Sequence, residues 1–177
     1  VYSDPKSYYD AWDININYPN MRKWKFKLDR FKTYIDGASV VRESIYNFKD
    51  SIIIKKVKLS AGDSAVVFDT TVDWRESHKM LRADFYPTVY SDVVNCDIQF
   101  GNVDRSTLQD TPIRKAQFEI CAHKFVNVDQ DNYGVALINN CKYGYRAKDG
   151  LLSLNLLRSP KYPDKECDMG EHKFSYA

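Results

Sequence analysis

The sequence lacks long apolar runs and has almost no net charge. Its apolar runs are far shorter than the roughly 20 residues of a membrane-spanning helix. Lysine and arginine (26) nearly balance aspartate and glutamate (24), so no overall charge favours binding to nucleic acid or to an anionic lipid surface. Neither nucleic acid nor a membrane is therefore expected as a partner. The first residues, Val1–Pro5, show no basic-then-apolar secretion signal and read as a chain entered midway.

Motifs for phosphate binding and for nucleophilic catalysis are also missing. The seven glycines are scattered and form neither a P-loop nor a dinucleotide-binding fingerprint. There is no G-x-S-x-G motif, and no serine or cysteine lies in a recognisable activating context. The sequence itself therefore predicts no catalytic residue of these kinds.

Cysteine and histidine are few and widely spaced. No C-x-x-C pair is present, and no histidine has a second ligand at helical spacing, so neither a metal site nor a bound cofactor is expected. The four cysteines are enough for two disulfides, but we interpret them as reduced, mostly buried thiols of a cytoplasmic protein. The residues concerned are Cys96, Cys121, Cys141 and Cys167, with His78, His123 and His172.

Aromatic residues, in contrast, are abundant, and they occur in alternating patterns. From Val66 to Trp74 every second residue is apolar or threonine, whereas Asp69, Thr71 and Asp73 occupy the other positions. A two-residue period is typical of a strand with one buried face. Similar alternation marks four further segments, namely Leu81/Ala83/Phe85, Cys96/Ile98/Phe100, Ala116/Phe118/Ile120 and Leu152/Leu154/Leu156.

Turn residues separate these short runs. Residues 39–48 and 51–59 predict a hairpin joined at Lys49-Asp50, and further turns are expected at 61–63, 101–102, 131–132 and 148–150. No helical pattern alternates with the strands, which argues against a Rossmann fold or a (β/α) barrel. We therefore predict an all-β sandwich of antiparallel sheets, in one domain spanning residues 1–177.

Two segments carry charged residues that suggest chemistry. The irregular stretch 158–172 is rich in acidic residues, and Asp10 and Asp13 flank Trp12. Two carboxylates across a cleft suffice for glycoside hydrolysis, but acidic residues in loops more often form turns or face solvent. A loop of this length on a β-scaffold is often functional, so a site is sought there first.

The basic stretch Arg22–Lys32 alternates lysines with aromatic and apolar residues. Such a pattern is compatible with stacking on nucleic-acid bases, but its regularity favours a strand with Trp24 and Phe26 turned inward. Other aromatic residues are candidates for stacking on sugar rings. The best placed are Trp12, beside its aspartates, and Tyr143 and Tyr145, which precede Arg158.

Several ordered motifs resemble the family 38 α-mannosidases. The earlier ones are YDAWDIN from Tyr9, VDWRESHKML from Val72 and DIQFG from Asp97. The more specific ones are YGVALINNCKYGY from Tyr133, LNLLRSPKYPD from Leu154 and DMGEHKFSY from Asp168. The resemblance covers essentially the whole chain and is strongest to the bacterial and cytosolic members.

This resemblance implies a fold, an activity and a partner. The fold would be the supersandwich, a β-sandwich of the galactose-mutarotase type, which follows the catalytic barrel in these enzymes. The barrel binds zinc through two His and two Asp and hydrolyses terminal α-linked mannose with retention. No barrel motif is present here, so the resemblance places zinc, nucleophile and acid outside this sequence. The expected partners are the barrel of the same enzyme and a mannose-containing oligosaccharide.

The resemblance also implies that Arg158 reaches the mannose pocket. A guanidinium can donate two hydrogen bonds to sugar hydroxyls; a surface salt bridge or a contact that holds the loop to Asp164 is the alternative explanation for an arginine here. Other residues expected at or near the pocket are Asp164, Asp168, His172, Tyr143, Trp12 and Asp13. The remaining alternatives are a free-standing carbohydrate-binding module and a purely structural β-sandwich.

Overall fold

A computed structural model describes residues 1–177 of the chain. The chain divides into two compact units. Unit 1 comprises Val1–Met80 and Leu157–Ala177, and unit 2 comprises Leu81–Leu156. The predicted all-β class is confirmed, because nearly all regular structure is antiparallel sheet. The single domain spanning 1–177 stays a prediction, and the two units are described separately. No helix has the length and apolar character needed to cross a membrane.

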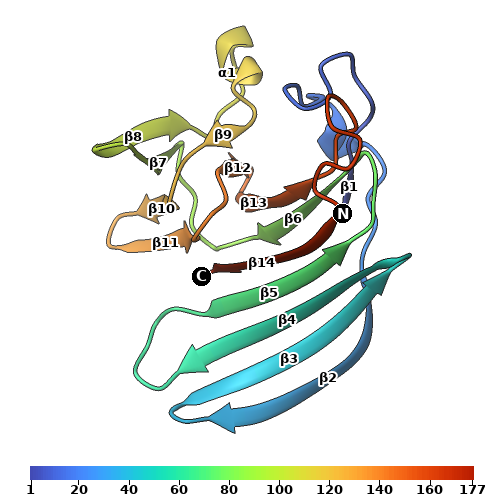
Figure 1. The fold of residues 1–177 in the computed structure, drawn as a ribbon. Helices are drawn as coiled ribbons and strands as arrows, with labels where there is room; N and C mark the ends of the chain where they lie inside the picture. Colours follow the sequence, from blue (N-terminus) through green and yellow to red (C-terminus); the bar gives the residue numbers. More distant parts are fainter. The chain divides into compact units, whose positions relative to one another are not determined.

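Unit 1 contains a broad five-stranded antiparallel sheet, seen in Figure 1 as the large sheet of β2 to β5 with β14. The strand order is β14-β5-β4-β3-β2. The predicted hairpin is confirmed, because β3 and β4 pair in register from Ser39↔Ser60 to Phe48↔Ser51 across the turn at Lys49-Asp50. The strands are β2 (Lys27–Asp36), β3 (Ser39–Phe48), β4 (Ser51–Ser60), β5 (Val67–Trp74) and β14 (Gly170–Tyr176).

The alternation in β5 also corresponds to a buried face. Thr70, Val72 and Trp74 are buried, whereas on the other face Asp69 is exposed and Thr71 and Asp73 are half-buried. Two short elements complete unit 1. Strand β1 (Tyr2–Ser3) pairs with the first residues of β6 (Lys79–Phe85), and the 3₁₀ helix η1 (Tyr18–Asn20) buries Tyr18.

The interpretation of Arg22–Lys32 as one strand is correct only for its second half. Strand β2 begins at Lys27, so Trp24 and Phe26 precede it. Both rings pack on Phe48, with ring centroids 6.2 and 5.4 Å away. They are therefore placed against the sheet as expected, but from an irregular segment.

One sheet face remains open along β2, β3 and β4. Ile35 pairs with Val40, and Val40 pairs with Leu59, so the three side chains lie on one face. All three are exposed, as is Phe31 on the same face of β2. The guanidinium of Arg42 lies over the Phe31 ring at 4.1 Å. This part of unit 1 therefore presents an apolar surface to its surroundings.

Unit 2 contains a four-stranded sheet of order β11-β10-β7-β8, and a second sheet in which β6, β13, β12 and β9 are neighbours. The turn between β12 and β13 has Asp149 and Gly150 both at positive φ, as a two-residue type I′ hairpin requires. The strands are β7 (Val93–Ile98), β8 (Gly101–Ser106), β9 (Ile120–Cys121), β10 (Phe125–Gln130), β11 (Tyr133–Ile138), β12 (Gly144–Lys148) and β13 (Leu151–Arg158).

Two strand predictions in unit 2 are wrong. Phe100 does not continue the buried face of β7, because it lies at positive φ in the turn before β8 and its side chain is fully exposed. The strand predicted at 116–120 is absent, because Ala116 ends the helix α1 (Pro112–Ala116), residues 117–119 belong to no helix or strand, and only Ile120–Cys121 form a strand. The cause is local: Thr111 caps the helix by accepting a hydrogen bond from Arg114 N, and Pro112 suits its first turn.

Candidate functional site at the end of strand β13

Arg158 is the last residue of β13, and its guanidinium is held by a buried carboxylate. Nε donates to Asp4 Oδ2 at 2.6 Å, and an Nη2 proton is donated to Asp4 Oδ1 at 3.3 Å. The Asp4 side chain is 1% exposed and that of Arg158 is 13% exposed. Two parallel hydrogen bonds fix both the position and the plane of the guanidinium.

The same guanidinium also contacts the segment that follows Asp4. Nη1 donates to the carbonyl oxygen of Ala11 at 3.3 Å, and Nη2 donates to the carbonyl oxygen of Asp13. These bonds satisfy two backbone oxygens in a stretch that has no strand partner. Arg158 therefore joins residues 4–13 to the end of β13.

Asp10 makes a second connection between these parts of the chain. It is buried, and its Oδ2 accepts from Lys161 N at 2.6 Å and lies 3.5 Å from His78 Nδ1. Its Oδ1 accepts from Ser7 N at 3.4 Å. A carboxylate with several donors can be buried without leaving an unsatisfied charge. We call residues 4–13 and 159–169, connected by Arg158 and Asp10, the loop pair.

Asp168 closes the base of the second loop. It lies at positive φ, and its Oδ2 accepts from Arg158 N at 2.8 Å. His172, on β14, lies with Nε2 3.0 Å from the carbonyl oxygen of Asp168. The backbone of Arg158 is thus held by Asp168 while its side chain is held by Asp4.

The electrostatics of the site centre on Asp4. Burial raises the pKa of the Asp4 carboxyl above its ordinary value, and the nearby charge of Asp10 adds to this effect. The Arg158 guanidinium opposes the shift, as does His78 to a smaller extent. The carboxyl is therefore more easily protonated than an exposed aspartate, even though it contacts a cation.

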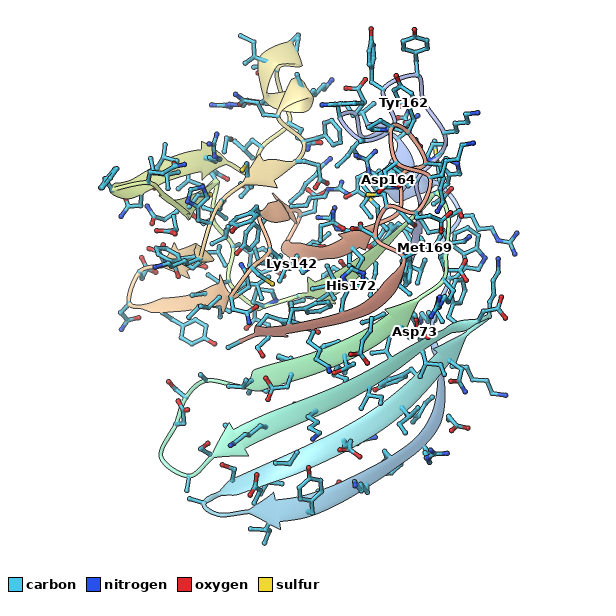
Figure 2. All side chains as sticks on the ribbon, viewed as in Figure 1. Asp73, Lys142, Tyr162, Asp164, Met169 and His172 are labelled. Atoms are coloured by element: carbon cyan, nitrogen blue, oxygen red, sulfur yellow. The ribbon has the colours of Figure 1, made fainter.

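A cleft of about 820 Å³ lies beside these contacts, and every residue that lines it belongs to unit 1. Figure 2 shows Tyr162, Asp164 and Met169 on the loop between β13 and β14, with His172 on β14. Near the cleft, the Trp12 and Tyr162 rings lie 6.3 Å apart, and both are largely exposed. The cleft is lined by Lys6, Ser7, Tyr8, Asp10, Ser77, His78, Lys161, Tyr162, Lys165, Glu166 and Met169.

The structure brings together most of the residues that the sequence singled out. Asp168 and His172 lie at the base of the loop pair, and Asp13 contacts Arg158 through its carbonyl oxygen. Asp164 is exposed and accepts from Glu166 N at 2.8 Å, so the carboxylate that pairs with Arg158 is Asp4 instead. Tyr143 belongs to unit 2, where its ring edge contacts His123 at 5.6 Å.

Sequence reasoning missed Asp4 as a partner of Arg158. The two residues are 154 positions apart, and a single aspartate before a proline carries no local sign of burial. The buried character predicted for the cysteines is wrong for most of them. Only Cys96 is buried, whereas Cys121 and Cys141 are exposed and Cys167 is half-buried.

The site offers donors and acceptors for a polyhydroxylated ligand but no ligand set for a metal. No group of three or more His, Cys, Asp or Glu is placed to hold a metal ion. Exposed tyrosine rings and lysines line the cleft, and such a combination of apolar and polar groups is common in sugar recognition.

Comparisons with known proteins identify relatives of this chain. A family model described as the glycosyl hydrolases family 38 C-terminal domain matches residues 1–166. Alpha-mannosidase G of Dictyostelium discoideum is 34% identical over 191 residues, and alpha-mannosidase 2C1 of Mus musculus is 36% identical over 182 residues. Each alignment covers the whole chain but only 17% of the relative.

The fold likewise has solved counterparts. The crystal structure of an alpha-mannosidase from Enterococcus faecalis V583 superimposes with a TM-score of 0.73 over 86% of this chain. The sequence identity is 16%, and 22% of that chain is covered. At this identity the match concerns the fold alone.

Proposed function

Because the chain belongs to glycosyl hydrolase family 38, where it corresponds to the C-terminal domain, we propose that it is a non-catalytic part of an α-mannosidase. In this proposal the whole enzyme hydrolyses terminal α-linked mannose. The domain packs on the catalytic barrel and contributes Arg158 to the mannose pocket. Zinc, the nucleophile and the general acid belong to the barrel, as the family resemblance implies.

The convergence of two loops on one arginine is the observation that supports this proposal. A strand end usually frays, but here Arg158 is ordered by its backbone, its side chain and two neighbouring carbonyl oxygens. Such ordering is typical of a side chain that must present a group in a defined direction.

The hydrogen-bond count limits what Arg158 can offer a sugar. Its known contacts use four N–H groups of the roughly five on a guanidinium. One Nη1 proton is left for a hydroxyl. A second donor becomes accessible only when the 3.3 Å contact with Ala11 is exchanged for the ligand. The two hydrogen bonds expected from the sequence therefore require a small shift of residues 4–13.

The exposed rings of the loop pair suit an interface with the barrel. Tyr8, Tyr9, Trp12 and Tyr162 are each more than half exposed, and large aromatic residues are enriched at the centres of protein interfaces. Trp12 stands between Ala11 and Asp13, whose carbonyl oxygens accept from Arg158, which supports a role for the arginine at the edge of this interface. The cytoplasmic location stays a prediction based on the sequence.

The direct test is the substitution Arg158→Lys in the α-mannosidase polypeptide that contains this chain. Losing a planar donor that binds substrate equally before and during reaction should raise KM about tenfold and leave kcat little changed. Arg114→Lys is the matched control, because Arg114 is an exposed arginine paired with the exposed Asp110. An unchanged KM for Arg158→Lys with an aryl α-mannoside would remove Arg158 from the pocket.

The cleft and its exposed aromatic rings favour one alternative, a free-standing carbohydrate-binding module. Calorimetry of the 177-residue chain with mannose and mannobiose separates the two functions. A domain that only completes a pocket should show no saturable heat in the millimolar range. Saturable binding that is lost in Trp12→Ala would support the module instead.

A further inference from the structure

Asp4 is the most buried of the charged residues in the loop pair, and its place beside Arg158 is set by ordered backbone. Asp4 N donates to the carbonyl oxygen of His78 at 2.9 Å. The preceding residue, Ser3, pairs with Lys79 in the sheet, and its N–H donates to Arg22 O at 3.1 Å. Hydrogen bonds therefore fix the backbone that carries the Asp4 carboxylate.

The geometry of the contact restricts how Arg158 can point. The two Asp4 oxygens take the Nε and Nη2 edge of the guanidinium, so the opposite edge, which carries Nη1, is the one that faces away from Asp4. A long arginine side chain has several rotatable bonds, and holding it in one orientation before ligand arrives avoids an entropic cost on binding.

We propose that Asp4 is the positioning residue for Arg158: its carboxylate sets the orientation in which the guanidinium meets a mannoside. This inference rests on the proposed function, because it concerns the same arginine. Asp4 itself touches no substrate in this account. It acts only through Arg158, and Asp168 fixes the backbone from which that side chain extends.

The charges around Asp4 should make its hold on Arg158 depend on pH. Arg158, Asp10 and His78 are the charged or titratable groups that act on the carboxyl. Protonation of Asp4 removes one acceptor and the negative charge, so the hold on Arg158 weakens as pH falls through the raised pKa. His78 and Asp10 also lie close to each other, and Asp10 accepts a hydrogen bond from Lys161 N.

The contribution of Asp4 to the stability of the chain changes with pH in the opposite direction to its hold on Arg158. A raised pKa means that the folded chain binds more protons than the unfolded chain between the ordinary and the raised value. The contribution of Asp4 to stability therefore increases as pH falls through that window. As pH falls, sugar affinity should therefore decrease while this contribution to stability increases. A purely structural role for Asp4 would not produce that difference.

The first measurement follows the Arg158 Nε–H resonance by NMR in the 177-residue chain near pH 7. The wild type should show a protected Nε–H signal, Asp4→Asn should exchange at least about tenfold faster, and Asp4→Glu should lie between them. Asp73→Asn is the control, because Asp73 pairs with the exposed Arg75 in the same unit. Protection that persists in Asp4→Asn would overturn the inference, whatever the enzyme does.

The second measurement compares KM for an aryl α-mannoside in the whole enzyme. We expect Asp4→Asn to raise KM about fivefold with kcat little changed, and Asp4→Glu to restore part of the loss. The wild-type KM should rise as pH falls through the raised pKa of Asp4, whereas that of Asp4→Asn should stay flat. The wild-type profile needs no substitution and so remains informative if Asp4→Asn folds poorly.

The KM values of Arg158→Lys and Asp4→Asn together distinguish a failure of this inference from a failure of the proposed function. A raised KM in both Arg158→Lys and Asp4→Asn supports the inference. A raised KM in Arg158→Lys alone overturns the positioning role of Asp4 and leaves the proposed function intact. An unchanged KM in both removes Arg158 from the pocket, and the inference with it.

Discussion

The five-stranded sheet and the loop pair belong to the same unit, but different forces hold them. The sheet is held by continuous backbone pairing and by a buried row that includes Val72 and Trp74. The loop pair has almost no regular structure, and its order depends on two buried carboxylates, Asp4 and Asp10, with Arg158. The sheet can therefore lose single polar contacts without losing its form, whereas the loop pair cannot.

The difference follows from how each kind of contact responds to change. Apolar burial is spread over many neighbours and has no preferred direction. A buried ion pair depends on both partners, and removing one leaves the other charge unsatisfied. Order in the loop pair is thus concentrated in a few residues, which suits a segment that presents a functional group and makes it sensitive to pH.

The largest expected effect is on the sheet. Trp74→Ala removes a fully buried side chain and should lower the free energy of unfolding by ~3–5 kcal/mol. Chemical denaturation followed by circular dichroism measures it. Ile54→Ala, at a half-exposed position on β4, is the control and should cost below ~1 kcal/mol. Equal losses in the two variants would contradict a core centred on this row.

The next effect is on the loop pair alone. Arg158→Met removes the cation and leaves the Asp4 carboxyl buried without its partner, which should cost ~3 kcal/mol or less, because Asp4 can then protonate. Hydrogen exchange should accelerate in residues 7–13 and 161–169 and stay unchanged in β3 and β4. Acceleration spread evenly over unit 1 would show that the two regions are one cooperative structure.

Unit 2 offers a neutral counterpart to the charged loop pair. Asn139 is buried, donates to His123 O, and accepts from Cys141 N at 2.9 Å and from Lys142 N. Asn139→Ala should cost ~1–3 kcal/mol, and the loss should be the same at neutral and mildly acidic pH because the side chain does not titrate. A strong pH dependence of this loss would remove the contrast with the loop pair.

The smallest effect is expected for an exposed ion pair. Asp110 accepts two hydrogen bonds from Arg114 at the start of α1, and this contact lowers the pKa of its carboxyl. Both side chains face solvent, so Asp110→Asn should leave the unfolding midpoint unchanged within error. A measurable shift would mean that burial is a poor guide to which ion pairs matter here.

The same contrast explains what could be predicted from the sequence. The sheet follows from local alternation, so the β3–β4 hairpin and the buried side of β5 were predictable from neighbouring residues. The helix at Pro112 was overlooked because the Thr-Pro start signal was outweighed by apparent alternation. The exposed Phe100 illustrates that alternation cannot show where a strand ends.

The site was predictable only in part. The family motifs singled out Arg158 and Asp168. Arg158 N donates to Asp168 Oδ2, ten positions along the chain. The motifs could not identify Asp4 as the partner of Arg158, because no pattern in the chain indicates which distant carboxylate becomes buried. Long-range ion pairs depend on tertiary structure, and burial of a charge is visible only once the packing around it is known.

In the proposed function this domain supports an α-mannosidase without cutting the glycosidic bond itself. The most direct measurement is turnover of an aryl α-mannoside by the purified 177-residue chain in the presence and absence of added zinc. We expect no release of the aryl group above the zinc-only blank. Saturable, zinc-dependent turnover that is abolished by a chelator would contradict it, because a complete catalytic site would then lie within these residues.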